Sequence, residues 1–174
     1  DLFFEASNNL WSEQNIDGKF PLNMAENNLS WELLRPKIEK ILKRKSIPDW
    51  VSNYTGTGGS DIFLASVSSF MERFLCNCPI NQENLAASAG ATAVIELAAW
   101  ALCNPSDVAV FPAPAYPVYT QDINNKAGVE RFDLHTHHSI SELKEGSCLT
   151  IKHLAKAKKE IAAHGKTFKL LVIT

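Results

Sequence analysis

The sequence predicts an α/β fold with a mostly parallel sheet. Through the second half of the 174-residue chain, strand-like apolar stretches alternate with segments of helical spacing, which is typical of βαβ units. Apolar strands are expected at 107–112, 129–136 and 168–174. Because helices cover both faces of such a sheet, the strand at 107–112 should be buried, whereas the strand at 129–136 has alternating faces.

Helices are expected where apolar residues recur every three or four positions. One such segment runs from 30 to 42 and contains Pro36, which must either lie in the first turn of the regular helix or kink it. A second runs from 60 to 75, and Ser60 or Asp61 is well placed to cap its N-terminus. The asparagine-rich stretch before the first helix is expected to be irregular.

Downstream of residue 80 the pattern changes to short strands and apolar helices. A short strand is expected at 84–90, followed by a helix at 91–103 that is almost wholly apolar and should therefore be buried, with Trp100 in the core. Further helices are expected at 116–128 and 151–164. The last of these has a lysine-rich wet face and is stopped by a glycine.

The composition excludes several classes of protein. With 45% hydrophobic and 21% charged residues the chain is typical of globular proteins, and a net charge of −2 gives no reason to expect nucleic acid or a membrane as partner. No apolar run approaches the ~18 residues that cross a bilayer. Four cysteines without a disulfide framework indicate free thiols in a reducing compartment, so a cytoplasmic location is expected.

The glycine-rich stretch SNYTGTGGSDIF, at 52–63, is similar in composition to phosphate-binding loops. A dinucleotide fingerprint needs a third glycine where Asp61 stands, and a Walker loop needs a lysine directly after Gly59. We therefore expect a flexible turn that feeds a capped helix. A nucleotide-binding α/β domain is an alternative, and it requires phosphate contacts at 56–60.

Two other stretches have the chemistry of a ligand site. Gly90, Ala91 and Thr92 open an expected helix directly after a strand, where small residues and the helix dipole favour an anion, although small residues there also serve packing. Tyr116 and Tyr119 follow a buried strand, at the edge where α/β proteins bind ligands. A ring there suits stacking on a flat heterocycle, or it packs under a loop.

The stretch DLHTHHS contains three histidines, His135, His137 and His138. No carboxylate or cysteine stands nearby at a matching spacing, so we interpret them as a solvated strand end and expect no metal.

Five segments in order carry a family resemblance: MAENNLSWELL, NYTGTGGSDIF, SAGATAVIELAAWAL, VFPAPAYPVY and LLVIT. Over nearly its whole length the chain resembles the first part of a fold-type-I pyridoxal-phosphate enzyme, in the branch of 1-aminocyclopropane-1-carboxylate synthases and related class I aminotransferases. The resemblance implies the N-terminal part of the aspartate-aminotransferase-type fold. Residues 1–48 would form an N-terminal arm and small-domain segment, and 49–174 the incomplete first part of the large cofactor-binding domain.

The resemblance also implies roles for named residues. Gly90, Ala91 and Thr92 match the turn that holds the phosphate of pyridoxal 5′-phosphate, and Tyr116 matches the ring that stacks on its pyridine. Tyr54 matches a tyrosine that reaches the phosphate of the neighbouring subunit's cofactor, which implies a homodimer with shared active sites. Ala25, Glu26 and Asn27 match the AEN motif near the pocket for the amino-acid substrate.

Two departures from the family pattern bear on the reaction. Thr57 stands where plant cyclopropane-forming enzymes have a tyrosine, so transamination and elimination, such as carbon–sulfur cleavage, are expected on equal terms with cyclopropane formation. The Schiff-base lysine is expected in a C-terminal portion beyond Thr174, because Lys144 does not lie in the lysine motif. The expected function is the N-terminal part of a pyridoxal-phosphate enzyme that acts on an amino acid through a Schiff-base intermediate. The alternative is a truncated or degenerate, non-catalytic relative.

Overall fold

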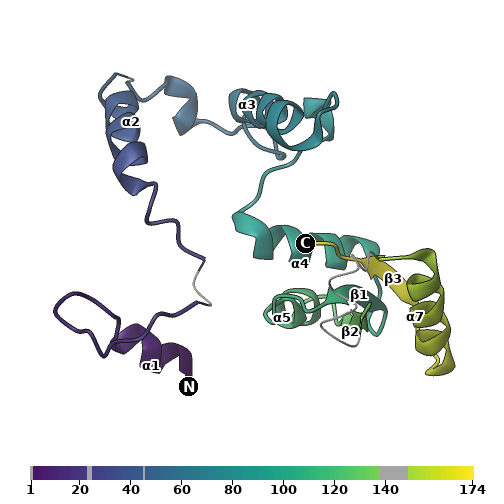
Figure 1. Ribbon diagram of the computed structural model, residues 1–174. Coiled ribbons are helices and arrows are strands. Elements are labelled where there is room, and N and C mark those ends of the chain that lie inside the picture. The colour runs from purple at the N-terminus through teal and green to yellow at the C-terminus, as the bar shows by residue number, and fades with distance from the viewer. Residues whose placement is uncertain (1, 23–24, 45, 138–148) are drawn as a thin grey trace. The chain divides into compact units, whose positions relative to one another are not determined.

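A computed structural model describes residues 2–22, 25–44, 46–137 and 149–174. The chain divides into two compact units, Asp1–Tyr54 and Thr55–Thr174, each of which is described by itself (Figure 1). We call them unit 1 and unit 2. Among the described residues, no helix is both long enough and apolar enough to cross a membrane.

Unit 1 contains two α-helices and a short 3-10 helix. These are α1 (Leu2–Asn8), α2 (Trp31–Arg44) and η1 (Asp49–Ser52). Helix α1 lies in the stretch that was expected to be irregular, and Glu5 of this helix pairs with Lys19 of the loop that follows. Pro36 lies inside α2 and not in its first turn, because the regular helix already begins at Trp31.

Unit 2 begins with helical segments. These are α3 (Asp61–Met71), a π-helical turn η2 (Glu72–Cys76), a 3-10 helix η3 (Gln82–Asn84) and α4 (Gly90–Leu102). Ser60 is the N-cap of α3, as predicted, and its Oγ accepts a hydrogen bond from the backbone N–H of Phe63 at 3.4 Å. This bond satisfies one of the unpaired N–H groups in the first helical turn.

The rest of unit 2 is a parallel sheet with its connecting helices. In chain order these are β1 (Val108–Ala113), α5 (Tyr119–Asn124), β2 (Glu130–His135), α7 (Ile151–Ala163) and β3 (Phe168–Leu171). The strand order is β2-β1-β3, and both pairings are parallel, with β1 and β2 in register from Val108↔Glu130 to Ala113↔His135. The predicted α/β class and parallel sheet are therefore confirmed.

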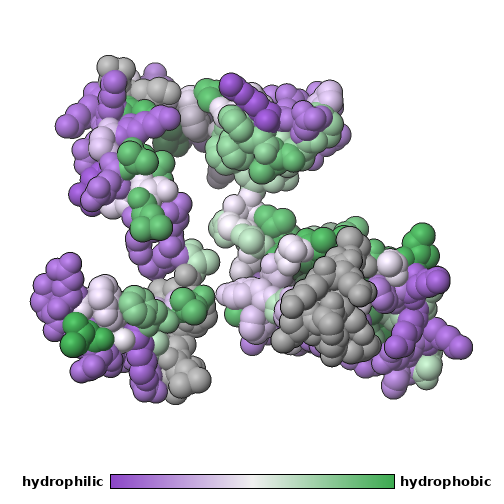
Figure 2. Space-filling model, in the orientation of Figure 1, coloured by the Kyte–Doolittle hydropathy of each residue, from purple (hydrophilic) through white to green (hydrophobic). Residues whose placement is uncertain are grey.

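Helices cover both faces of the central strand, which explains its burial. On one face Phe111 and Ala109 of β1 join a buried cluster with Ala99 of α4 and Ile123 of α5. On the other face β1 packs against α7, whose outer side is hydrophilic (Figure 2). Five of the six residues of β1 are buried as a result.

Three expectations about this unit were wrong. No strand forms at 84–90, where the backbone N–H of Ala87 donates to the carbonyl of Gly58 at 2.7 Å and no strand among the described residues pairs with the segment. Helix α4 is not buried on all sides: Trp100 is 59% exposed and lies under the ammonium of Lys126, with 5.4 Å from that nitrogen to the ring centroid. Helix α5 is shorter than the predicted 116–128.

Candidate functional site

The turn at the N-terminus of α4 has the features of an anion site. Gly90 adopts a left-handed backbone conformation (φ +88°), and a Cβ built there would meet no atom within 4 Å. The N-cap residue, Ala89, provides no side-chain hydrogen bond. Gly90, Ala91 and Thr92 are all exposed at the positive end of the helix dipole, and the N–H of Gly90 donates to the carbonyl of Ser88 at 2.9 Å.

The ring of Tyr116 lies on the loop that follows β1, and it is 56% exposed. Its edge meets the ring of Tyr119, with centroids 5.4 Å apart and planes at 81°. Tyr119 in turn stacks on the buried Phe111, at 5.3 Å and 19°. A series of three aromatic rings thus connects the core of unit 2 to an exposed ring at the carboxyl end of the central strand.

Topology places the α4 turn and Tyr116 at the same edge of the sheet. Helix α4 packs on β1 and is joined to it by the short connection 103–107, in which the chain reverses direction. The N-terminus of a helix that precedes a strand in this way lies beside the carboxyl end of that strand, where α/β proteins bind their ligands.

Sequence reasoning missed one residue of this region, Arg131 of β2. Its Nη1 donates hydrogen bonds to the carbonyl oxygens of Tyr116 (2.9 Å) and Pro117 (3.2 Å), and its Nη2 to that of Ala115 (3.3 Å). Its Nε donates to Oδ1 of Asp133 at 2.9 Å. The spacing of two between Arg131 and Asp133 could have indicated this pair, because residues two apart on a strand share a face. No local pattern could indicate the carbonyls.

The other predicted site residues belong to unit 1. Tyr54 is fully exposed, and Ala25, Glu26 and Asn27 are exposed. Asn27 has a local structural contact, since its Oδ1 accepts a hydrogen bond from the N–H of Ser30 at 3.2 Å just before α2. The proposed roles of these four residues stay predictions.

The glycine-rich loop supports the approach to the α4 turn. Gly59 has φ +124°, a conformation that favours glycine, and its N–H donates to the carbonyl of Gly56 at 3.1 Å. Gly58 accepts the hydrogen bond from Ala87, two residues before the helix N-cap. The loop therefore has a packing role, as the turn interpretation expects, and a nucleotide is not needed to explain its glycines.

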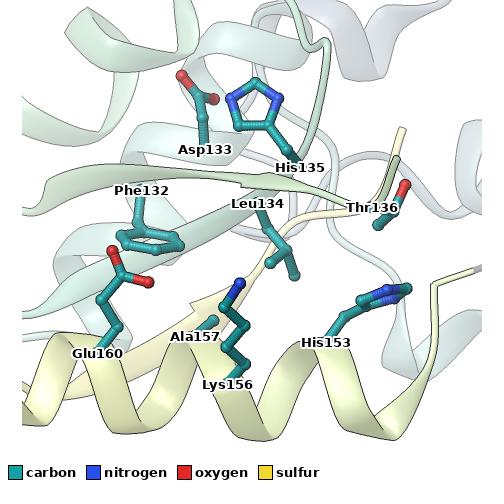
Figure 3. A pocket seen from close by; sticks show the side chains of 9 residues that line it. All are labelled: Phe132, Asp133, Leu134, His135, Thr136, His153, Lys156, Ala157 and Glu160. Atoms are coloured by element: carbon teal, nitrogen blue, oxygen red, sulfur yellow. The ribbon is translucent and has the colours of Figure 1, made fainter. Parts of the chain in front are cut away.

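A separate hollow of about 430 Å³ lies between β2 and α7. Figure 3 shows Phe132 and Leu134 directed toward α7, whereas Asp133 and His135 project from the opposite side of the strand. Helix α7 contributes polar side chains, including Lys156, to its wall. This hollow was not predicted, and it lies on the face of the sheet that is opposite Phe111.

The structure describes two of the three histidines of the stretch DLHTHHS, which was expected to be a solvated strand end. His135 is exposed and His137 is half-buried, while His138 and Lys144 lie outside the described residues. Within the described ranges, no three histidine, cysteine or acidic side chains form a group that could hold a metal. Burial, together with the charge of Asp107, raises the pKa of the Cys103 thiol, and Lys169 opposes this shift.

Comparison with known proteins identifies the family of the chain. The family model for class I and II aminotransferases matches residues 20–174. The chain is 28% identical to 1-aminocyclopropane-1-carboxylate synthase 7 of Arabidopsis thaliana, over 70% of this chain and 29% of that protein. It is 27% identical to 1-aminocyclopropane-1-carboxylate synthase 4 of Oryza sativa subsp. japonica, over 92% of this chain and 34% of that protein.

Solved structures support the same fold. An archaeal alanine:glyoxylate aminotransferase superposes with a TM-score of 0.61 at 18% identity, over 82% of this chain and 32% of that one. The kynurenine aminotransferase of Pyrococcus horikoshii gives a TM-score of 0.53 at 20% identity, over 80% of this chain and 31% of that one. The chain spans about a third of the length of the curated relatives it matches. It belongs to the family of class I and II aminotransferases.

Proposed function

We propose that the chain is the N-terminal part of a pyridoxal-phosphate enzyme that acts on an amino acid. The observation that carries this proposal is the exposed first turn of α4, which has no side-chain cap and lies at the same edge of the sheet as the exposed ring of Tyr116. The turn at the N-terminus of α4 suits a phosphate, and the exposed ring of Tyr116 suits stacking on a pyridine ring. Family membership adds the cofactor, because pyridoxal 5′-phosphate is what this family implies.

The proposed roles follow from the position of each group. The backbone of the turn formed by Gly90, Ala91 and Thr92 binds the phosphate, and the Thr92 hydroxyl adds a donor. Tyr116 covers one face of the cofactor ring and holds it flat. When bound, the cofactor acts as an electron sink for the α-carbon of an amino acid. Tyr54 is proposed to reach the phosphate in a homodimer, and Ala25, Glu26 and Asn27 to lie near the substrate.

The reaction itself is proposed as a choice between transfer and elimination. The relatives include proteins named as cyclopropane-forming synthases, and the structural neighbours include proteins named as aminotransferases. Thr57, in place of the tyrosine of the plant pattern, makes transamination and carbon–sulfur elimination at least equal candidates to cyclopropane formation. The step at the α-carbon needs a lysine, for which we propose the C-terminal portion of the same protein. A cytoplasmic location is proposed from the free thiols.

Binding of pyridoxal 5′-phosphate and of pyridoxal, which lacks the phosphate, to the protein at its natural length tests the site. We expect Thr92→Ala to weaken pyridoxal 5′-phosphate binding about tenfold, because a hydrogen bond to a charged group is lost, and to leave pyridoxal binding unchanged. Thr167→Ala, at the opposite edge of the sheet, is the control. Equal affinities of the wild-type protein for the two compounds would contradict the proposal.

Tyr116→Ala should weaken the binding of both compounds about tenfold, because both carry the ring on which Tyr116 stacks. Trp100→Ala removes an aromatic side chain of similar exposure from the same unit and should change neither affinity. Product analysis then separates the reactions: transamination needs an added 2-oxo acid, whereas elimination releases ammonia without one.

A further inference from the structure

The hydrogen-bonding groups of Arg131 are fully occupied, which bears on what this side chain can do. A guanidinium has five N–H groups. They meet three loop carbonyls, one Thr120 hydroxyl at 3.4 Å and one oxygen of Asp133, which lies 2.9 Å from Nε and 2.8 Å from Nη2. The side chain is only 12% exposed. Arg131 is therefore not available to bind a substrate carboxylate, although it lies near the candidate site.

The carbonyls that Arg131 binds belong to the segment that carries Tyr116. Residues 114–118 form neither helix nor strand, and the segment includes two prolines without N–H groups. The carbonyls of Tyr116 and Pro117 accept long backbone hydrogen bonds from the N–H groups of Tyr119 (3.4 Å) and Thr120 (3.3 Å), and each carbonyl oxygen has a second lone pair for a further partner. The planar fork of Arg131 supplies that partner at 115, 116 and 117 together, which a single ammonium does not match in geometry.

The guanidinium is itself fixed from two sides. Asp133, two residues along the same face of β2, neutralises its charge. Its central carbon lies 5.2 Å from the centroid of Phe111, the buried ring on which Tyr119 stacks. Arg131 thus holds the backbone of the Tyr116 loop through hydrogen bonds and contacts the ring of Phe111. Phe111 in turn supports the ring of Tyr119, which Tyr116 touches.

We propose that Arg131 is a positioning residue, which fixes the ring of Tyr116 in the orientation that stacks on the cofactor. This inference rests on the proposed function, because it needs a flat heterocycle at Tyr116. Arg131 acts only through the loop, so its removal should weaken binding of the ring and leave the phosphate turn of α4 unaffected.

The experiment measures dissociation constants for pyridoxal 5′-phosphate, pyridoxal and inorganic phosphate with the protein at its natural length. Arg131→Met keeps an apolar stem over Phe111 and removes the donors. We expect Arg131→Met to weaken the binding of both ring compounds about five- to tenfold and to leave phosphate binding unchanged. It should also reduce the circular dichroism that pyridoxal 5′-phosphate acquires when bound. Arg73→Met is the matched control, since Arg73 also lies 5.2 Å from a phenylalanine centroid but has no such carbonyl partners among the described residues.

A double-mutant cycle with Tyr116→Ala tests the route of action. If Arg131 acts through Tyr116, the double variant should bind the ring compounds within about twofold of Tyr116→Ala alone. Additive losses would overturn the inference, and so would unchanged ring binding or an equal loss of phosphate binding in Arg131→Met. If Arg131→Met does not fold, Arg131→Lys replaces it. We expect the same selective loss of binding of the ring compounds, and full retention of their affinity in Arg131→Lys would overturn the inference. Failure of the wild-type protein to bind pyridoxal 5′-phosphate would instead refute the proposed function.

Discussion

Replacing Phe111 with alanine should test how much of the stability of unit 2 depends on burial of this ring. The side chain has no exposed surface. A buried phenylalanine removes roughly 150–250 Å² from water, which at about 25 cal/mol per Å² corresponds to ~4–6 kcal/mol. Part of this is recovered when the surroundings relax, so we expect Phe111→Ala to lower the free energy of unfolding by about 4 kcal/mol.

Phe74 provides a control that differs from Phe111 mainly in burial. Each ring has one aromatic partner, Tyr119 at 5.3 Å for Phe111 and Phe70 at 5.2 Å for Phe74, and each has a guanidinium carbon 5.2 Å from its centroid. Phe74, however, is 63% exposed. Its apolar contribution should therefore be roughly a third as large, and alanine regains about half a kcal/mol of helix propensity. We expect Phe74→Ala to cost about 1 kcal/mol.

Urea denaturation followed by far-ultraviolet circular dichroism measures both variants. The reasoning requires a clear separation of the two midpoints at unchanged slope. Equal costs for the two substitutions would show that ring pairing and the nearby cation, and not burial, determine the contribution of Phe111. A cost below about 1 kcal/mol for Phe111→Ala would refute the assignment of this ring to the core.

The remaining predictions concern a helix cap, a backbone conformation and a thiol. Ser60→Ala should destabilise unit 2 by about 1 kcal/mol through loss of the N-cap bond, whereas Ser66→Ala, inside the same helix, should change stability by less than about 0.5 kcal/mol in the same urea titration. Gly59→Ala should cost about 1–2 kcal/mol because of its positive φ, and an unchanged midpoint would contradict that strain. Cys103, whose pKa is raised by burial, should react with iodoacetamide at pH 8 more slowly than the exposed Cys76, as peptide mass analysis would show. The folded state holds this proton more tightly than the unfolded state, so the contribution of Cys103 to stability is present at neutral pH and should be lost as the pH rises through the range in which the thiol titrates.

The elements that could be predicted from sequence are those set by local patterns. The apolar runs of β1 and β3 and the alternating faces of β2 are sufficient to indicate a parallel sheet, and Ser60 marks the start of α3. The strand expected at 84–90 does not form, because a strand also needs a neighbouring strand to pair with. The sequence does not show that this segment instead bonds to a loop residue, Gly58. Strand assignment at that segment was therefore a question about tertiary contacts.

The burial of Trp100 was wrongly predicted for a related reason. A helix that is apolar on all sides indicates that its faces need cover, but the pattern does not show which face the sheet takes. In the structure β1 packs against the side of α4 that carries Ala99, and Trp100 points away from it. Arg131 could not be predicted either, because its partners are main-chain carbonyls, which leave no trace in the identity of the residues that carry them.

Together these two failures indicate how the candidate site is built. Phe111 is buried because helices cover β1, and the same ring supports Tyr119, on which the exposed Tyr116 rests. Arg131 contacts this ring and also the loop carbonyls, so the core and the site share a structural element. The orientation of Tyr116 therefore depends on residues of β1 and β2 that do not touch a ligand. A search of the sequence for ligand-binding residues alone does not find these residues, because their selection depends on packing.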